Sequence, residues 1–154
     1  MADILRIEKE MKNLVSSNKI PVTKAEKING NNLIWKVVFE GPEATPYEYG
    51  IFTIKFIFPE SYPKNGPEAL FLTKIIHPNV SSKKHICINL LNDWISSRTI
   101  EDVMLGIMYI MINPIPEDGY DNEATKLLKS DTDAFYDKAE EYTELYAKNE
   151  VKED

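Results

Sequence analysis

The chain has 154 residues, of which 43% are hydrophobic and 28% are charged, and its formal net charge is −7. This size and composition fit a single soluble globular domain, and the negative charge argues against nucleic acid as the principal ligand. The apolar runs are too short to cross a membrane, and the first residues lack the basic-then-apolar pattern of a secretory signal. We therefore expect a protein of the cytosol or nucleus that binds no membrane.

The N-terminal half predicts a helix followed by an antiparallel sheet. Residues 3–16 carry apolar side chains at helical spacing, and Arg6 and Lys9 fall on or beside the exposed face of that helix. Alternating apolar residues then predict four strands, near 21–28 and over 33–40, 51–58 and 68–72. Because the connections are short, we expect the strands to form an antiparallel meander.

An irregular segment follows the sheet. Residues 73–98 show no regular period, and a stretch of this length without secondary structure inside a compact domain is often functional. A capping-box pattern at Thr99 and Asp102 then predicts the start of an almost wholly apolar helix, which Pro114 ends. We expect this helix to be central and buried.

The rest of the chain predicts two more helices, at 121–129 and from about 130 onward. Residues 149–154 are mostly polar, and we expect them to fray. The order of helix, four-stranded sheet, irregular segment and three helices predicts an α+β fold, with one domain over residues 1–148.

The irregular segment contains both histidines and the only cysteine, Cys87. One thiol and two histidines do not make a convincing metal site. No histidine lies downstream of Cys87, which excludes the residue order of a papain-like protease. An Ile-Cys-Ile triplet is by itself more typical of a buried structural thiol. The residues alone therefore leave open both a structural thiol and a nucleophile that carries an acyl group as a thioester.

Thioester chemistry would need two further groups near Cys87. An amine that attacks a thioester creates an oxyanion, which a side-chain amide can stabilise, and Asn79 lies eight residues upstream. A carboxylate close to the thiol would help to orient and deprotonate the amine. Spacing alone does not identify that carboxylate.

A set of motifs in one order resembles the ubiquitin-conjugating enzyme family. His77-Pro78-Asn79, followed by Ile86-Cys87-Ile88-Asn89, resembles the active-site signature of that family. The resemblance continues over roughly residues 3–148 through Gly41-Pro42, Thr45-Pro46-Tyr47, Phe58-Pro59, Tyr62-Pro63, Trp94 and Asn113-Pro114-Ile115-Pro116-Glu117-Asp118. It implies a four-stranded sheet packed among helices and an enzyme that conjugates ubiquitin to proteins.

The resemblance also implies roles for single residues. Cys87 is expected to accept the C-terminal glycine of ubiquitin as a thioester. Asn79 is expected to stabilise the oxyanion or to hold the loop that does so, and Asp118 to orient and deprotonate the incoming lysine. His77 and Pro78 are expected to fix the local turn. Neither a cofactor nor a metal is implied for the chain itself, because the activating enzyme consumes the ATP.

The implied partners are ubiquitin, its activating enzyme, RING or HECT-type ligases and substrate proteins, with the chain acting as a monomer. Arg6 and Lys9 match basic positions on the helix that meets the activating enzyme and ligases, and Lys64 and Ser96 lie in the two ligase-facing loops. Lys64 stands where a phenylalanine is usual in the family. Because apolar anchors carry much of the energy of small interfaces, we expect a restricted or unusual set of ligases.

Other departures from the family pattern keep two alternatives open. Asn89 also occurs in members specific for the modifier NEDD8, whereas Thr45-Pro46-Tyr47 is more typical of members that use ubiquitin. A non-catalytic scaffold for ubiquitin chains is the second alternative, and the presence of Cys87 argues against it. Ile76 replaces a tyrosine that often precedes His-Pro-Asn, so lysine placement is expected to rest more on Asp118.

Overall fold

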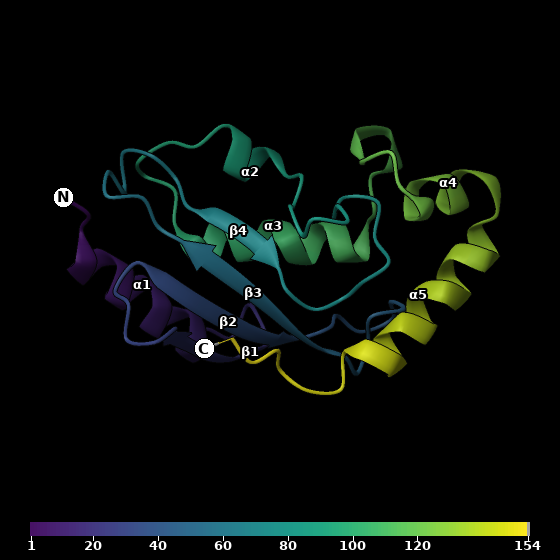
Figure 1. The fold of residues 1–154 in the computed structure, drawn as a ribbon, viewed down its shortest axis with the longest axis horizontal. Coiled ribbons are helices and arrows are strands. Elements are labelled where there is room, and N and C mark those ends of the chain that lie inside the picture. Colours follow the sequence, from purple (N-terminus) through teal and green to yellow (C-terminus); the bar gives the residue numbers. More distant parts are fainter. Residues whose placement is uncertain (154) are drawn as a thin grey trace.

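The computed structural model describes residues 1–153 and has the predicted α+β architecture (Figure 1). One antiparallel sheet has the strand order β1-β2-β3-β4, which confirms the predicted meander. Its strands are β1 (Val22–Lys27), β2 (Ile34–Glu40), β3 (Ile51–Ile57) and β4 (Glu68–Phe71). The helices are α1 (Ile4–Ser16), α2 (Asn89–Asn92), α3 (Ile100–Ile112), the 3-10 helix η1 (Pro116–Asp118), α4 (Glu123–Ser130) and α5 (Thr132–Tyr146).

The sheet has one face in the core and one face turned away from it. Val37 and Phe39 of β2 are completely buried in a cluster that includes residues of α1 and α3. Since successive side chains of a strand point to opposite faces, Lys36 and Val38 belong to the outer face. Val38 is aligned with Thr53 of β3, and both are buried although they lie outside that core cluster. Another part of the chain must therefore cover the outer face.

Helix α3 begins as predicted but is not buried all round. The hydroxyl of Thr99 accepts a hydrogen bond from the backbone N–H of Asp102, whose carboxylate accepts one from Thr99 in return. One side of the helix fills the core. The other side leaves Leu105, Tyr109 and Ile112 exposed by 38%, 57% and 52%, so the expectation of a central buried helix holds for the core side and is wrong for this one. None of the helices in the described residues is long and apolar enough to cross a membrane.

The irregular segment is more ordered than its sequence indicates. It contains the single turn of α2 and two isolated β-bridges, Leu70 with His85 and Val80 with Ile86. These bridges fold the segment back on itself and attach it to β4. They hold His85 and Ile86, the two residues before Cys87, in bridges that local periodicity does not reveal.

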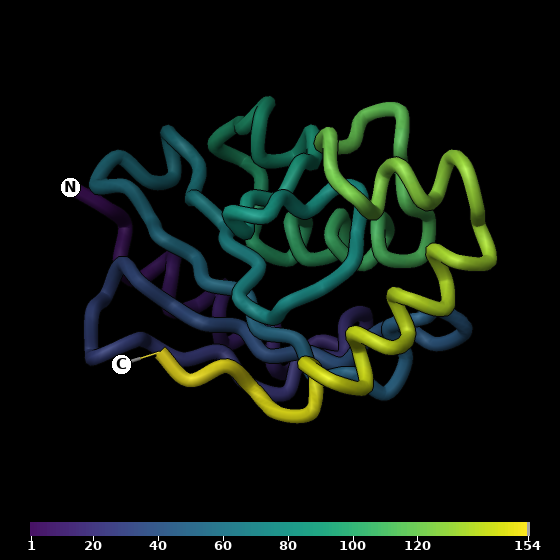
Figure 2. Tube along the Cα trace, turned by 45° about the vertical axis from the view of Figure 1, so that its right-hand side comes forward, coloured from purple at the N-terminus to yellow at the C-terminus, as the bar shows by residue number. Residues whose placement is uncertain are grey.

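The expectation of a frayed tail is wrong for residues 149–153, while residue 154 lies outside the described residues. The C-terminal segment turns back after α5 and runs along the sheet (Figure 2). Its first contact is the carbonyl of Ala147, which accepts a hydrogen bond from the backbone N–H of Ile51 at 2.8 Å. Farther along, the N–H of Val151 donates to the hydroxyl of Thr53 at 2.9 Å. This segment covers the outer face.

Candidate active site

The thiol of Cys87 lies between the turn at residues 77–79 and the 3-10 helix η1. The flanking residues Ile86 and Ile88 are buried, whereas Cys87 is partly exposed and its thiol is free. The backbone N–H of Cys87 donates to the carbonyl of Asn79 at 2.8 Å, and the thiol faces the carbonyl of Asp118 at 3.4 Å. The two isoleucines anchor the backbone and leave the sulfur within reach of solvent. The structure therefore does not make Cys87 a core thiol.

His77 connects the active-site turn to helix α3. Its Nδ1 accepts a hydrogen bond from the backbone N–H of Asn79 at 2.9 Å, so the proton sits on Nε2, which donates to the carbonyl of Ile110 at 2.6 Å. Burial lowers the pKa of His77 to about 4, which keeps the ring neutral at neutral pH. Because the backbone occupies both ring nitrogens, His77 has no free nitrogen for proton transfer in this geometry.

Asn79 is fully buried and bonds with both ends of its side-chain amide. Its Nδ2 donates to the carbonyl of Ile115 at 3.1 Å, and its Oδ1 accepts from the N–H of Ile115 at 3.0 Å. This pair of bonds joins the turn to the segment just before η1. Of the two roles expected for Asn79, the geometry therefore favours holding the loop. To stabilise an oxyanion, Asn79 would have to use its remaining Nδ2 hydrogen for the thioester carbonyl on Cys87.

Asp118 ends η1 with its side chain exposed, and its carboxylate forms no hydrogen bond or ion pair within residues 1–153. Close packing of the residues that follow Asp118 against Pro78 fixes its position. The N–H of Tyr120 donates to the carbonyl of Pro78 at 2.9 Å, and a Cβ at Gly119 would lie only 2.8 Å from that same oxygen. Glycine thus permits the approach of η1 to the turn. Pro78 and Asp118, far apart in sequence, are brought to the same rim as Cys87.

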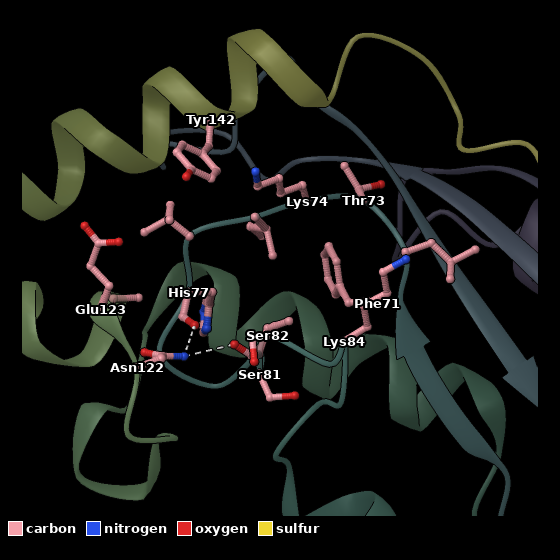
Figure 3. A pocket seen from close by; sticks show the side chains of 15 residues that line it. Phe71, Thr73, Lys74, His77, Ser81, Ser82, Lys84, Asn122, Glu123 and Tyr142 are labelled. Carbon is pink, nitrogen blue, oxygen red and sulfur yellow. Dashed lines mark hydrogen bonds between the residues drawn. The ribbon is translucent and has the colours of Figure 1, made fainter.

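Two residues that the sequence did not single out complete the site. Asn122 caps helix α4 by accepting from the N–H of Thr125, and its Nδ2 donates to the carbonyls of His77 at 3.4 Å and Val80 at 3.1 Å (Figure 3). An asparagine before a helix is a recognisable cap, but nothing local predicts that it also reaches the active-site turn. Tyr120 lies close enough to Cys87 that burial, together with a thiolate charge there, raises the pKa of its phenol.

A cavity of about 540 Å³ lies behind the turn, with His77, Ser81, Lys84, Asn122 and Tyr142 among the residues that line it (Figure 3). Cys87 is not among them. The thiol, which is partly exposed, thus stands on an open rim outside this cavity. Within the described residues, no group of His, Cys, Asp and Glu side chains is arranged to hold a metal ion. An open rim suits a reaction between two proteins more than the enclosure of a small substrate.

Comparison with known proteins agrees with this geometry. Residues 6–143 match the model of the family described as ubiquitin-conjugating enzyme. The chain belongs to the ubiquitin-conjugating enzyme family. It is 38% identical to ubiquitin-conjugating enzyme E2 13 of Saccharomyces cerevisiae over 93% of this chain and 94% of that protein. It is also 35% identical to ubiquitin-conjugating enzyme E2 N of Macaca fascicularis, over 95% and 96% of the two chains.

Solved structures show the same relationship. The E2 domain of a ubiquitin-conjugating enzyme from Toxoplasma gondii superposes with a TM-score of 0.85 at 34% identity, covering 93% of this chain and 97% of that one. The recognised family and the fold predicted from the sequence are thereby confirmed, and the chain is an enzyme of the ubiquitin-conjugating type.

Two of the residues expected to face partners on the first helix of this conjugating enzyme differ in their surroundings. Lys9 is exposed as expected. Arg6 is only partly exposed, because its guanidinium pairs with Glu10 at 3.0 Å and donates to the carbonyl of Arg98 at 2.8 Å. Arg6 thus lies beside the exposed face of α1, where it ties this helix to the segment before α3.

The two loops expected to face ligases lie side by side. The indole N–H of Trp94 donates to the carbonyl of Pro63 at 2.8 Å, and Lys64 and Ser96 are both exposed on the joined loops. Ile95, which sequence inspection did not select, is exposed by 55%. An apolar side chain is thus available on this surface, although Lys64 itself offers none.

Proposed function

We propose that this enzyme accepts ubiquitin from the activating enzyme as a thioester on Cys87 and passes it to a lysine amine, or to a cysteine of a ligase. The proposal rests above all on the free and partly exposed thiol of Cys87, which is held at an open rim between the His77–Asn79 turn and η1. A thiol of this kind can react with a protein-sized donor without a closed pocket.

In the proposed loading step, the thiolate of Cys87 attacks the carbonyl carbon of the ubiquitin C-terminal glycine, which is bound as a thioester to a cysteine of the activating enzyme. A new carbon–sulfur bond forms, the old one breaks, and the thiolate of the activating enzyme leaves. One thioester replaces another, so the exchange is nearly balanced in energy and needs no bound cofactor on this chain.

In the proposed discharge step, a lysine amine attacks the thioester carbon, an isopeptide bond forms and the Cys87 thiolate leaves. The amine must lose a proton before or during the attack, and the free carboxylate of Asp118 stands at the same rim to orient it and accept that proton. Asn79 contributes by holding the segment that carries Asp118 beside the thiol.

We further propose that ubiquitin is the modifier and that the enzyme acts as a monomer in the cytosol or nucleus, together with RING or HECT-type ligases. The names of its relatives support ubiquitin. NEDD8 is the alternative, motivated by Asn89, which is exposed at the first position of α2. A non-catalytic scaffold is a weaker alternative, because it would have no use for an accessible thiol.

A charging assay tests the proposal. The protein is mixed with ATP and either the ubiquitin-activating or the NEDD8-activating enzyme, each with its own modifier, and a non-reducing gel is examined for an adduct that thiols cleave. We expect an adduct with ubiquitin that is absent in Cys87→Ala, and a thiol-resistant ester in Cys87→Ser. An adduct with NEDD8 alone would overturn the modifier, and no adduct with either would overturn the proposed activity.

A further inference from the structure

The C-terminal segment over residues 147–153, here called the tail, lies on three lysines of the outer sheet face. Glu150 pairs with Lys24 at 2.6 Å and with Lys36 at 2.7 Å, and Glu153 pairs with Lys55. The three lysines come from β1, β2 and β3, and we call them the lysine row. Two carboxylates three residues apart in the tail therefore reach across three strands.

The central lysine of this row needs an anionic partner. The side chain of Lys36 is only 11% exposed, and a lysine so far removed from water is costly unless it is paired. Glu26 supplies one carboxylate at 3.3 Å, and Glu150 supplies the closer one. The ammonium groups of Lys24 and Lys36 hold the pKa of Glu150 at about 2, so this carboxylate stays charged at neutral pH.

The tail also donates one backbone hydrogen bond to the outer face. The Val151 N–H donates to the Thr53 hydroxyl, and the Thr53 residue is completely buried on a face that belongs to no core cluster. Lys152 points to solvent, while its neighbours Val151 and Glu153 are partly covered. The outer face thus offers an extended segment complementary charge, a hydroxyl that accepts a hydrogen bond from its backbone, and a surface that it partly covers.

We propose that the outer face of the sheet is a binding site for an extended acidic segment with two carboxylates three residues apart, filled here by the enzyme's own tail and open to such a segment of a partner protein when the tail leaves. The chain between α5 and the lysine row is short, so the tethered tail has an effective concentration of roughly the millimolar range. Lys24 and Glu153 are 41% and 34% exposed, and ion pairs with such accessible partners are individually weak and are screened by salt. The tail is therefore held firmly enough to be ordered but loosely enough to be exchanged.

The proposal does not depend on the thioester chemistry and can be tested on the intact chain. The protection of the Val151 N–H from hydrogen exchange measures the equilibrium between the docked and the undocked tail. We expect protection in the wild type, its loss in the double variant Glu150→Ala/Glu153→Ala, and its retention in Glu140→Ala/Glu144→Ala. The latter removes two carboxylates from the exposed side of α5 and serves as the matched control.

A peptide with the sequence of residues 147–154 then tests binding in trans, followed through the backbone amide signals of Lys36, Thr53 and Lys55. On Glu150→Ala/Glu153→Ala we expect saturable shifts with a Kd at or below about 1 mM. On the wild type the same peptide should bind more weakly, by the same factor as the protection of the Val151 amide, because tail and peptide compete.

Three outcomes would overturn the proposal. An unprotected Val151 amide in the wild type would show that the tail does not dock. Equal affinity of the peptide for wild type and double variant would show that the tail does not occupy the site. If a peptide with glutamine at both glutamate positions bound as tightly as the original peptide, the lysine row would not be recognising the carboxylates.

Discussion

The side-chain amide of Asn79 forms two hydrogen bonds with the backbone of Ile115, one through Nδ2 and one through Oδ1. Ile115 directly precedes η1, at whose end Asp118 meets the Cys87 thiol through its carbonyl. The buried amide therefore sets the position of the exposed carboxylate relative to the sulfur. A residue that touches no solvent thus positions the one expected to contact the incoming lysine.

Replacing Asn79 should affect both stability and transfer. Asn79→Ala leaves the N–H and the carbonyl of Ile115 without partners, and we expect the free energy of unfolding to fall by about 1–3 kcal/mol. Discharge to lysine should slow about 100-fold or more. Loading should change little, because the attacking thiolate of Cys87 needs no help from Asp118. Urea unfolding and single-turnover discharge measure the two effects. Slower discharge with unchanged stability would instead assign Asn79 to the oxyanion.

Asp118→Ala should slow discharge to lysine by about 100-fold at neutral pH, because the amine loses a positioned carboxylate. The defect should shrink as the pH approaches the usual lysine pKa of about 10.4, where the amine deprotonates without help. Rates of free-lysine discharge from the charged enzyme across this pH range test the prediction. Glu117→Ala, which removes the neighbouring exposed carboxylate of η1, is the matched control. Equal rates for Asp118→Ala and wild type at every pH would show that the assigned role is wrong.

The buried ring of His77 should make stability depend on pH. Its pKa is lowered from 6.5 to about 4, so between these values the unfolded chain binds a proton that the folded chain does not. The free energy of unfolding should therefore rise with pH across this window. His77 contributes up to about 3 kcal/mol to the free energy of unfolding. This contribution is present in full above the pKa of 6.5 that His77 has in the unfolded chain, and it is lost as the pH falls towards 4.

Urea unfolding between these pH values measures the slope, and NMR of the ring protons shows whether His77 takes up a proton. His85→Gln, at the exposed histidine, should keep the slope. A His77 ring that titrates near 6.5 in the folded protein would contradict the prediction.

The surface formed by the two joined loops should decide which ligases act. Lys64→Phe supplies the apolar anchor that is usual at this position in the family, and we expect it to widen the range of RING ligases that stimulate discharge. Ile95→Asp should abolish stimulation by the ligases that act on the wild type, because Ile95 is the exposed apolar side chain next to Ser96. Charging by the activating enzyme is the control for both variants. No gain for Lys64→Phe across a panel of RING ligases would count against the role given to this position.

The sequence by itself determined the helix, the four-stranded meander and the segment that carries the thiol. Periods of two and of 3.6 residues, the cap at Thr99 and the stop at Pro114 act over a few neighbouring residues, so their structural result can be recognised without knowing the rest of the fold. The ordered motifs around Cys87 likewise indicated the family before any distance was known.

Only the tertiary structure decided how the site is held and what covers the sheet. Asn79 and Ile115 are 36 residues apart, and Cys87 and Asp118 are 31 apart. Such contacts arise when separate elements pack together, and no local pattern specifies them. The tail shows the same limit. Its polar sequence indicated fraying, yet Glu150 finds lysines of β1 and β2 that only the folded sheet brings side by side, and those ion pairs hold the segment in place.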